Sequence, residues 1–164
     1  MNTARIAVFP GSFDPVTLGH ENIVRRALPL FDKIVIAIGR NAEKSGMFPV
    51  EVRKSFLDDL FKDEKRVETA IYDTLTIDFC RSINARFILR GLRSGNDFEY
   101  ERLIGLSNQK IAPEIESVFL MADNRYDFTS STVARDLLRY GKPLDGFVPE
   151  PVCGMIRTYL AQKP

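Results

Sequence analysis

The sequence is poor in the residues that build metal sites and disulfide frameworks. It has only two cysteines, Cys80 and Cys153, and they lie far apart in the chain. No C-x-x-C pair occurs, which argues against both a zinc knuckle and a thioredoxin-type redox pair. We expect each cysteine to be a free thiol in a packed helix, which fits a protein of the reducing cytoplasm. No metal-ligating residues are predicted.

An excess of charge of one sign and long apolar runs are also missing. The 23 basic and 22 acidic side chains leave a net charge of +1. That balance argues against a bulk electrostatic grip on nucleic acid or on an anionic membrane. No apolar run approaches the ~20 residues that a membrane span needs, and Met1 to Phe9 lack the apolar stretch of a signal peptide. We therefore expect a cytoplasmic protein with neither a nucleic-acid nor a membrane partner.

The length of 164 residues predicts a single domain over residues 1–164. The composition, with 45% apolar and 27% charged residues, is that of a globular protein. A domain of this size buries roughly 70% of the surface of its unfolded chain, so it needs no disulfide or metal to fold. No internal repeat, low-complexity stretch or long linker divides the chain.

Strand-like and helix-like patterns alternate along the chain. Short apolar runs predict five buried strands, at Ile6–Phe9, Ile34–Ile38, Val67–Tyr72, Phe87–Leu89 and Ser117–Met121. Apolar residues at helical spacing predict helices at about 23–31, 52–61, 75–83, 97–111, 131–140 and 149–162. Short continuous apolar strands are typical of a parallel sheet that is buried on both faces. The pattern favours an α/β fold, a doubly wound, Rossmann-like five-stranded parallel sheet with helices on both faces.

The loops that follow the strands are the candidate site, because ligands of open α/β sheets bind at the carboxyl ends of the strands. In the first such loop, Gly11 would let the backbone approach an anion closely, and Ser12 adds a hydroxyl. Gly19 and His20 open the next helix, whose free N–H groups and dipole favour an anion. His20 is the only histidine, and there its imidazole could donate to a phosphoryl oxygen. The alternative is that the glycines serve only the turn and that His20 has a structural role.

Two common nucleotide-binding motifs are absent. No G-x-G-x-x-G follows the first strand, which argues against a dinucleotide-dependent dehydrogenase. Residues 39–45 resemble a Walker A loop but lack its second glycine, which argues against a P-loop kinase. Lys44, in this loop, is a flexible point charge that suits phosphate. It could equally be an ordinary surface lysine.

Cationic and hydroxyl side chains follow the fourth and fifth strands. Arg90 and Arg93 flank Gly91 and Leu92 directly after the fourth strand, where they could grip phosphates through bidentate bonds. Glu101 lies one turn into the next helix, where it could also be part of a solvated face. After the fifth strand, Thr129, Ser130, Ser131 and Thr132 form a run of four hydroxyls. A helix cap would use one or two of them, and the rest could hold phosphates.

These segments carry a resemblance to a known family. Thr17-Leu18-Gly19-His20 resembles the (H/T)-x-G-H signature of a nucleotidyltransferase superfamily. Arg90-Gly91-Leu92-Arg93, Asp97-Phe98-Glu99-Tyr100-Glu101 and Glu116-Ser117-Val118-Phe119-Leu120-Met121 resemble the pantetheine-phosphate adenylyltransferase family. The resemblance covers roughly residues 5–160. It implies transfer of AMP from ATP to 4′-phosphopantetheine, with pyrophosphate and dephospho-coenzyme A as products. It also implies a cytoplasmic homohexamer that uses Mg²⁺ and responds to coenzyme A as a feedback ligand.

The resemblance also implies roles for individual residues. His20, Lys44 and Arg93 are the expected catalytic residues, with His20 at the α-phosphate. The acceptor substrate is expected to contact Ser12, Lys44, Thr76 and Arg90. ATP is expected to contact Ser12, Phe13, His20, Gly91, Leu92, Arg93, Glu101, Tyr126, Asp127, Phe128, Thr129, Ser130, Ser131 and Thr132. Two positions depart from the family pattern, because Ser12 stands where threonine is frequent and Thr76 where an apolar residue occurs.

The residue set fits in-line displacement at the α-phosphorus. This reaction needs positioning and charge stabilisation rather than a covalent protein nucleophile, and no nucleophile–base pair is recognisable in the sequence. Mg²⁺ would be held mainly by ATP and water. Three alternatives stay open: a transferase of the same superfamily with another acceptor, such as a nicotinate nucleotide, a non-catalytic nucleotide sensor, and a kinase.

Overall fold

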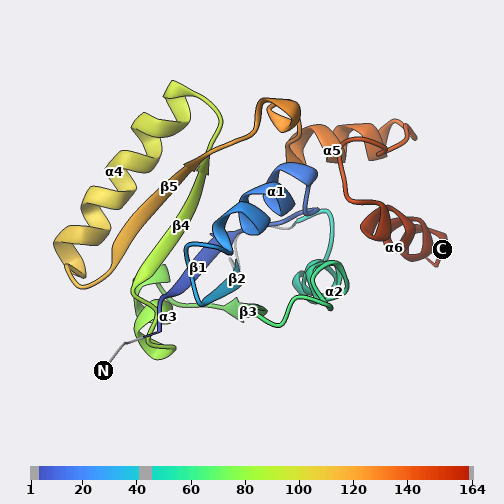
Figure 1. Ribbon diagram of the computed structural model, residues 1–164. Coiled ribbons are helices and arrows are strands. Elements are labelled where there is room, and N and C mark those ends of the chain that lie inside the picture. Colours follow the sequence, from blue (N-terminus) through green and yellow to red (C-terminus); the bar gives the residue numbers. More distant parts are fainter. Residues whose placement is uncertain (1–3, 41–45, 163–164) are drawn as a thin grey trace.

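A computed structural model of the protein describes residues 4–40 and 46–162. Its centre is a five-stranded parallel sheet with the strand order β3-β2-β1-β4-β5 (Figure 1). The strands are β1 (Ile6–Gly11), β2 (Lys33–Gly39), β3 (Val67–Tyr72), β4 (Phe87–Leu92) and β5 (Glu116–Met121). The chain builds outward from β1 in one direction and then restarts on the other side of β1 with β4. Such a reversal leaves a crevice at the carboxyl ends of β1 and β4, where open α/β sheets bind ligands.

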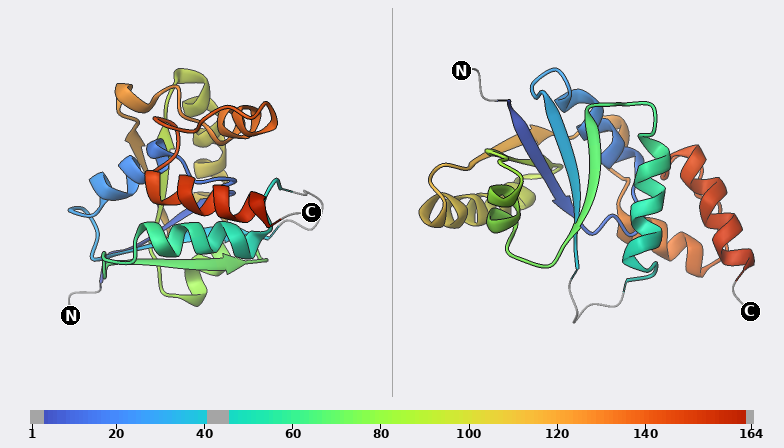
Figure 2. Two further views of the ribbon diagram at one scale, coloured as in Figure 1. Left: turned by 90° about the vertical axis from the view of Figure 1, so that its right-hand side faces the viewer. Right: turned by 90° about the horizontal axis from the view of Figure 1, so that it is seen from below.

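Helices cover both faces of the sheet, as the sequence predicts. They are α1 (Leu18–Ala27), α2 (Val50–Leu60), α3 (Thr76–Ser82), α4 (Gly95–Ile111), α5 (Ser131–Arg139) and α6 (Glu150–Ala161), with a short 3-10 turn, η1 (Asn124–Tyr126). The predicted α/β class and doubly wound parallel sheet are therefore confirmed. Figure 2 shows α2 and α6 side by side on one flank of the sheet, where they contact each other.

Two apolar clusters hold the layers together, one on each face of the sheet. In β1, Ala7 and Phe9 face one cluster, while Val8 between them faces the other. The larger cluster buries the apolar sides of α1, α2 and α6, and the smaller one buries α3 with residues 112 and 115 after α4. This alternation is the period of two that a strand buried on both faces requires. None of the helices among the described residues has both the length and the apolar character needed to cross a membrane.

Both cysteines lie in helices, as expected. Cys80 in α3 and Cys153 in α6 are buried free thiols. Burial raises the pKa of the Cys80 thiol to about 12. Because the thiolate is the reactive species, Cys80 is an inert packing residue.

Two strands run at least two residues further at their carboxyl ends than the sequence predicts. β1 continues through Pro10 to Gly11, which pairs with Ile38, and β4 continues to Leu92. Arg90 was expected just after the fourth strand, but it lies within β4, opposite Phe119. A glycine or an arginine supplies ladder hydrogen bonds like any other residue, so the end of the apolar run did not mark the end of either strand.

Candidate active site

Two adjoining pockets open at the carboxyl ends of the strands. The larger has a volume of about 740 Å³ and the smaller about 350 Å³. The smaller pocket lies over β1 and β4 and is closed by the starts of α1 and α5, whereas the larger extends toward β2, β3 and α4. Six residues line both: Pro10, Gly11, Ser12, Arg90, Glu101 and Arg135.

Most of the predicted site residues meet in these pockets. The smaller pocket is lined by Ser12, Phe13, His20, Arg90, Gly91, Arg93, Glu101, Tyr126, Thr129, Ser130, Ser131 and Thr132. Thr76 lines the larger pocket. Lys44 lies outside the described residues. Three predicted residues line neither pocket: Leu92, Asp127 and Phe128.

Each of these three side chains has another environment. Leu92 is buried in β4, and the exposed ring of Phe128 packs edge-on against Phe147. Asp127 is exposed and ends η1. The family resemblance made them candidates as parts of the segments 91–93 and 126–132, but neighbouring residues of a strand or turn point in different directions.

His20 is held by a capping box at the start of α1. Thr17, the N-cap residue, accepts a hydrogen bond from the His20 amide, and its own backbone N–H donates to His20 Nδ1 at 3.0 Å. A backbone N–H can only donate, so Nδ1 carries no proton and the neutral ring is protonated at Nε2. The ring packs against Phe13, with 5.0 Å between centroids. Nε2 is therefore left as a hydrogen-bond donor for a ligand.

The surroundings of His20 keep it neutral. Burial is the main cause that lowers its pKa, to about 4, and the positive charges of Arg93 and Arg90 lower it further. At neutral pH the ring is therefore an uncharged donor rather than an imidazolium.

The backbone of α1 does not offer the free N–H groups that the sequence led us to expect. Leu18 N donates to Phe147 O at 3.0 Å, and Gly19 N donates to Thr129 Oγ1 at 3.1 Å. With His20 N bonded to Thr17, the first turn of α1 is satisfied. The first turn of α1 therefore has no free N–H group for an anion, although Thr17, Gly19 and His20 all line the smaller pocket.

The N-terminus of α5, rather than that of α1, has backbone N–H groups without a partner in its own helix. Ser130 caps α5 by accepting from Val133 N at 3.1 Å. The N–H groups of Ser131 and Thr132, in the first turn, have no acceptor within the helix, and both residues line the smaller pocket. With the positive end of the helix dipole they form a site suited to a phosphate.

The run of four hydroxyls has mostly structural partners. Thr129 Oγ1 is buried, accepts from Gly19 N and donates to Tyr126 O at 2.7 Å. Ser131 Oγ donates to Pro15 O at 2.8 Å. These hydroxyls fasten the start of α1 and the β1–α1 loop to α5, so their first role is to fix the shape of the pocket wall.

Glu101, expected to contact the nucleotide, lines both pockets, and its carboxylate is held by Arg90. Arg90 Nε donates to Glu101 Oε2 at 2.7 Å, and a second nitrogen bonds the other carboxylate oxygen. The third bond of this guanidinium goes to Pro10 O at 2.8 Å. Glu101 is the one buried residue of α4. The bidentate pair orients Arg90 at the border between the pockets and neutralises a carboxylate that would otherwise repel phosphate.

Other residues have environments that the sequence did not indicate. Arg135 of α5 lines both pockets and donates to Asp14 O at 2.8 Å. In the sequence it is one of several charged residues of an amphipathic helix, and no signal distinguishes it. Gly11 lines both pockets, and it is also required sterically, because a Cβ there would lie 2.9 Å from the Phe13 ring.

Comparisons with known proteins show the family of this chain. Residues 8–137 match the family model described as cytidylyltransferase-like, which places the chain among nucleotidyltransferases of this fold. Proteins named phosphopantetheine adenylyltransferase are similar to nearly the whole chain. That of Flavobacterium johnsoniae is 52% identical over 90% of this chain and 97% of its own length. That of Leptospira biflexa is 47% identical, over 90% of this chain and 92% of its own. The chain belongs to the phosphopantetheine adenylyltransferase family within this class.

Proposed function

We propose that this protein transfers the adenylyl group of ATP to 4′-phosphopantetheine, giving dephospho-coenzyme A and pyrophosphate. The observation that carries the proposal is the pair of adjoining pockets with Ser12 and Arg90 on their shared border. Two substrates bound side by side there would bring the acceptor phosphate to the α-phosphorus of ATP. Holding both reactants in place is the main contribution that such a displacement requires.

The smaller pocket is assigned to ATP. It combines His20, Arg93 and the start of α5, which are donors and positive charge for a triphosphate. Arg93 is held near the pocket by a hydrogen bond from its side chain to Thr129 O at 3.3 Å. The pocket offers no uncompensated carboxylate, because Asp97 and Glu101, which also line it, are each paired with an arginine.

The larger pocket is assigned to 4′-phosphopantetheine. Its walls include the apolar side chains of Leu75, Ile104 and Phe119, which suit an uncharged arm. Arg90 at its inner end, with Lys44, would bind the terminal phosphate. Thr76 Oγ1 is hydrogen-bonded to the Tyr72 hydroxyl at 2.8 Å, so the Thr76 side chain already has a partner and its backbone is the better candidate for a substrate contact.

The proposed chemistry is a single in-line displacement. An oxygen of the acceptor phosphate forms a bond to the α-phosphorus of ATP. At the same time the bond between the α-phosphorus and the oxygen that bridges to the β-phosphate breaks, and pyrophosphate leaves with that oxygen. His20 Nε2–H donates to a non-bridging α-phosphate oxygen, where negative charge develops. Arg93 and the N–H groups at the start of α5 stabilise the departing pyrophosphate. No covalent intermediate on the protein is involved.

Mg²⁺ belongs to the proposal as a companion of the nucleotide. Among residues 4–40 and 46–162, no three His, Cys, Asp or Glu side chains come together as a metal site. The protein would therefore bind Mg²⁺ through the phosphates of ATP and through water, as this ion prefers. Its chemistry when bound is to neutralise charge on the triphosphate.

The proposal extends to assembly, location and regulation. A homohexamer in the cytoplasm, with coenzyme A as a feedback ligand, is what the family resemblance implies. Support for self-association comes from α4, which leaves Tyr100, Leu103 and Leu106 at least half exposed. Support for a reducing compartment comes from the two free cysteines.

A product assay tests the function. The protein is mixed with ATP, Mg²⁺ and 4′-phosphopantetheine, with nicotinate mononucleotide as the competing acceptor, and phosphorus products are identified by NMR. We expect pyrophosphate and dephospho-coenzyme A. ADP with a newly phosphorylated acceptor would identify a kinase. Turnover of the nicotinate nucleotide alone would identify another transferase, and ATP binding without any product would identify a sensor.

A further inference from the structure

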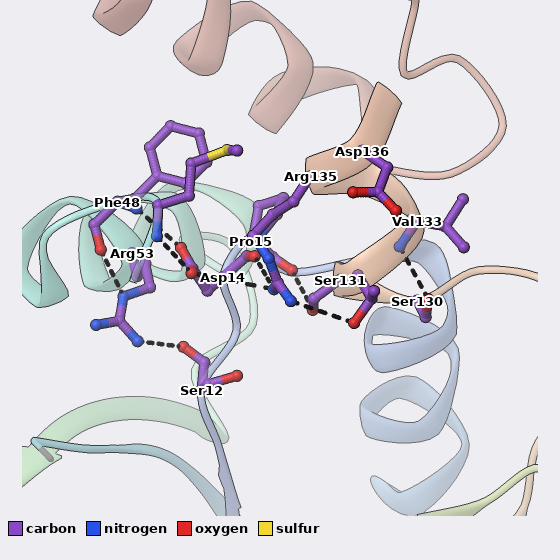
Figure 3. A network of polar contacts seen from close by, with 12 residues as sticks. Ser12, Asp14, Pro15, Phe48, Arg53, Ser130, Ser131, Val133, Arg135 and Asp136 are labelled. Atoms are coloured by element: carbon purple, nitrogen blue, oxygen red, sulfur yellow. Dashed lines mark hydrogen bonds and ion pairs between the residues drawn. The ribbon is translucent and has the colours of Figure 1, made fainter. Parts of the chain in front are cut away.

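The proposed chemistry leaves one buried carboxylate in the β1–α1 loop without a role. Asp14 is only 5% exposed and lines the larger pocket. Its Oδ2 accepts from Met47 N at 2.8 Å and its Oδ1 accepts from Phe48 N at 2.9 Å, as Figure 3 shows. Both carboxylate oxygens thus bind consecutive backbone amides of a segment 33 and 34 residues away. Residues 46–48 lead into α2, and Gly46 and Met47 form part of the rim of the larger pocket.

Two arginines extend this connection on either side of Asp14 (Figure 3). Arg53 of α2 bridges the same two segments, with 2.9 Å from Nε to Phe48 O and 2.8 Å from a terminal nitrogen to Ser12 O. Arg135 of α5 donates to Asp14 O at 2.8 Å, and its guanidinium lies 4.0 Å from Asp14 Oδ2. Asp14 therefore joins the β1–α1 loop to the 46–48 rim through its carboxylate, and to α5 mainly through its backbone oxygen.

We propose that Asp14 is a positioning residue for the acceptor substrate, which it serves by holding the 46–48 rim at a fixed distance from Ser12. This rests on the proposed function, since it takes the larger pocket as the acceptor side. Asp14 does not line the smaller pocket, so its loss acts first on the acceptor. A carboxylate is needed rather than an amide of the same shape, because two N–H donors converge on the two oxygens of one side chain.

The substitutions follow from this geometry. Asp14→Asn keeps one acceptor oxygen but turns an amide NH₂ toward the second backbone N–H, which leaves buried donors unpaired. Asp14→Ala removes both bonds. We expect the acceptor KM to rise about tenfold in Asp14→Asn, because a hydrogen bond to a charged group is worth roughly a factor of ten or more. The rise should be larger in Asp14→Ala, with a much smaller change in the KM for ATP.

Asp32 provides a matched control. Its carboxylate also accepts from a backbone amide, Arg5 N at 2.7 Å, but it precedes β2 at the other end of the sheet and lines neither pocket. Asp32→Asn should lower the melting temperature without changing either KM. A purely structural Asp14 would behave in the same way. A folded Asp14→Asn protein with an unchanged acceptor KM, or with equal losses for both substrates, would overturn the proposal.

A second measurement separates this proposal from the function it rests on. Amide hydrogen exchange in the substrate-free protein should show faster exchange of Met47 and Phe48 in Asp14→Asn and not in Asp32→Asn. Unchanged protection of both amides would refute the positioning role whatever the acceptor is. If Asp14 variants fail to fold, Arg53→Met should raise the acceptor KM in the same direction, and no rise would count against the proposal. A wild-type protein inactive with 4′-phosphopantetheine would refute the function alone.

Discussion

The neutral state of His20 is a consequence of its contacts and can be measured directly. As the only histidine in the chain, it gives a single imidazole signal in NMR. We expect that signal to titrate near pH 4, because burial, Arg93 and Arg90 all lower its pKa. Binding of ATP should raise the pKa, since the triphosphate favours the charged ring. A midpoint near the ordinary value of 6.5 would contradict the assignment.

The same shift makes stability depend on pH in a defined direction. The pKa of His20 is lower in the folded protein than in the unfolded chain, so the unfolded chain binds the proton preferentially. The free energy of unfolding should therefore fall as the pH drops from about 6.5 toward 4, by at most about 3 kcal/mol from this group. Thermal melts of the wild type and of His20→Asn over this pH range measure the contribution of His20, because the variant should lack this pH dependence.

His20→Asn also tests catalysis with little change to the fold. The asparagine oxygen can accept from Thr17 N in place of Nδ1, which keeps the capping box, whereas the donor at Nε2 is lost. A donor aimed at a developing oxyanion is worth about 10²–10³ in rate, so kcat should fall by that factor with a nearly unchanged melting temperature. Single-turnover kinetics provide the rate of the chemical step. An unchanged rate in the folded variant would exclude this role.

At the level of elements, the Thr129 hydroxyl fastens the start of α1 to the segment before α5, and so fixes the wall of the smaller pocket. Thr129→Val removes the hydroxyl that joins Gly19 N to Tyr126 O. Gly19 N then lacks an acceptor, while Tyr126 O keeps its bond from Thr129 N. An unpaired amide of this kind costs roughly 1–3 kcal/mol. We expect a lower melting temperature and a higher KM for ATP. Thr129→Ser, which keeps the hydroxyl, is the control and should restore both. Loss of stability with an unchanged KM for ATP would show that the hydroxyl has a structural role only.

The sequence predicts features that depend on consecutive residues, but not contacts between segments that lie far apart in the chain. The strands were found because runs such as Ile34–Ile38 are buried on both faces, a property of consecutive residues. The pairing of Arg90 with Glu101 depends on how β4 and α4 lie together, and no spacing within either segment encodes it. The role of Asp14 could not be predicted either, because its partners are two backbone amides and every residue except proline has such a group.

The whole molecule shows a feature that its own core does not explain. In α4, Glu101 is the only buried residue, while several large apolar side chains of this helix lie in contact with solvent: Phe98, Tyr100, Leu103, Ile104, Leu106 and Ile111. A surface helix of a monomer normally turns such residues inward. Large apolar side chains that are exposed on one helix are typical of an interaction site. Ile104 and Ile111 also line the larger pocket and the Phe98 ring packs against Phe119, so Tyr100, Leu103 and Leu106 are the exposed residues that support a contact with another chain. The helix predicted over 97–111 is confirmed as α4.

Self-association through α4 gives the last prediction. If α4 packs against other copies of the chain, placing a charge in the contact should dissociate the assembly, because a buried unpaired charge is costly. Leu103→Glu, in a side chain that is 58% exposed here, should therefore reduce the mass measured by light scattering from that of the proposed hexamer to a smaller species.

Leu30→Glu is the matched control for this experiment, since Leu30 is 46% exposed and lies just after α1 rather than on α4. It should leave the mass unchanged. Both variants should keep the wild-type far-UV circular dichroism, because neither side chain belongs to the buried clusters. A wild type that is monomeric at micromolar concentration would refute the hexamer. An assembly that survives Leu103→Glu but not Leu30→Glu would place the interface elsewhere, because the charge that disrupts a contact must lie within it.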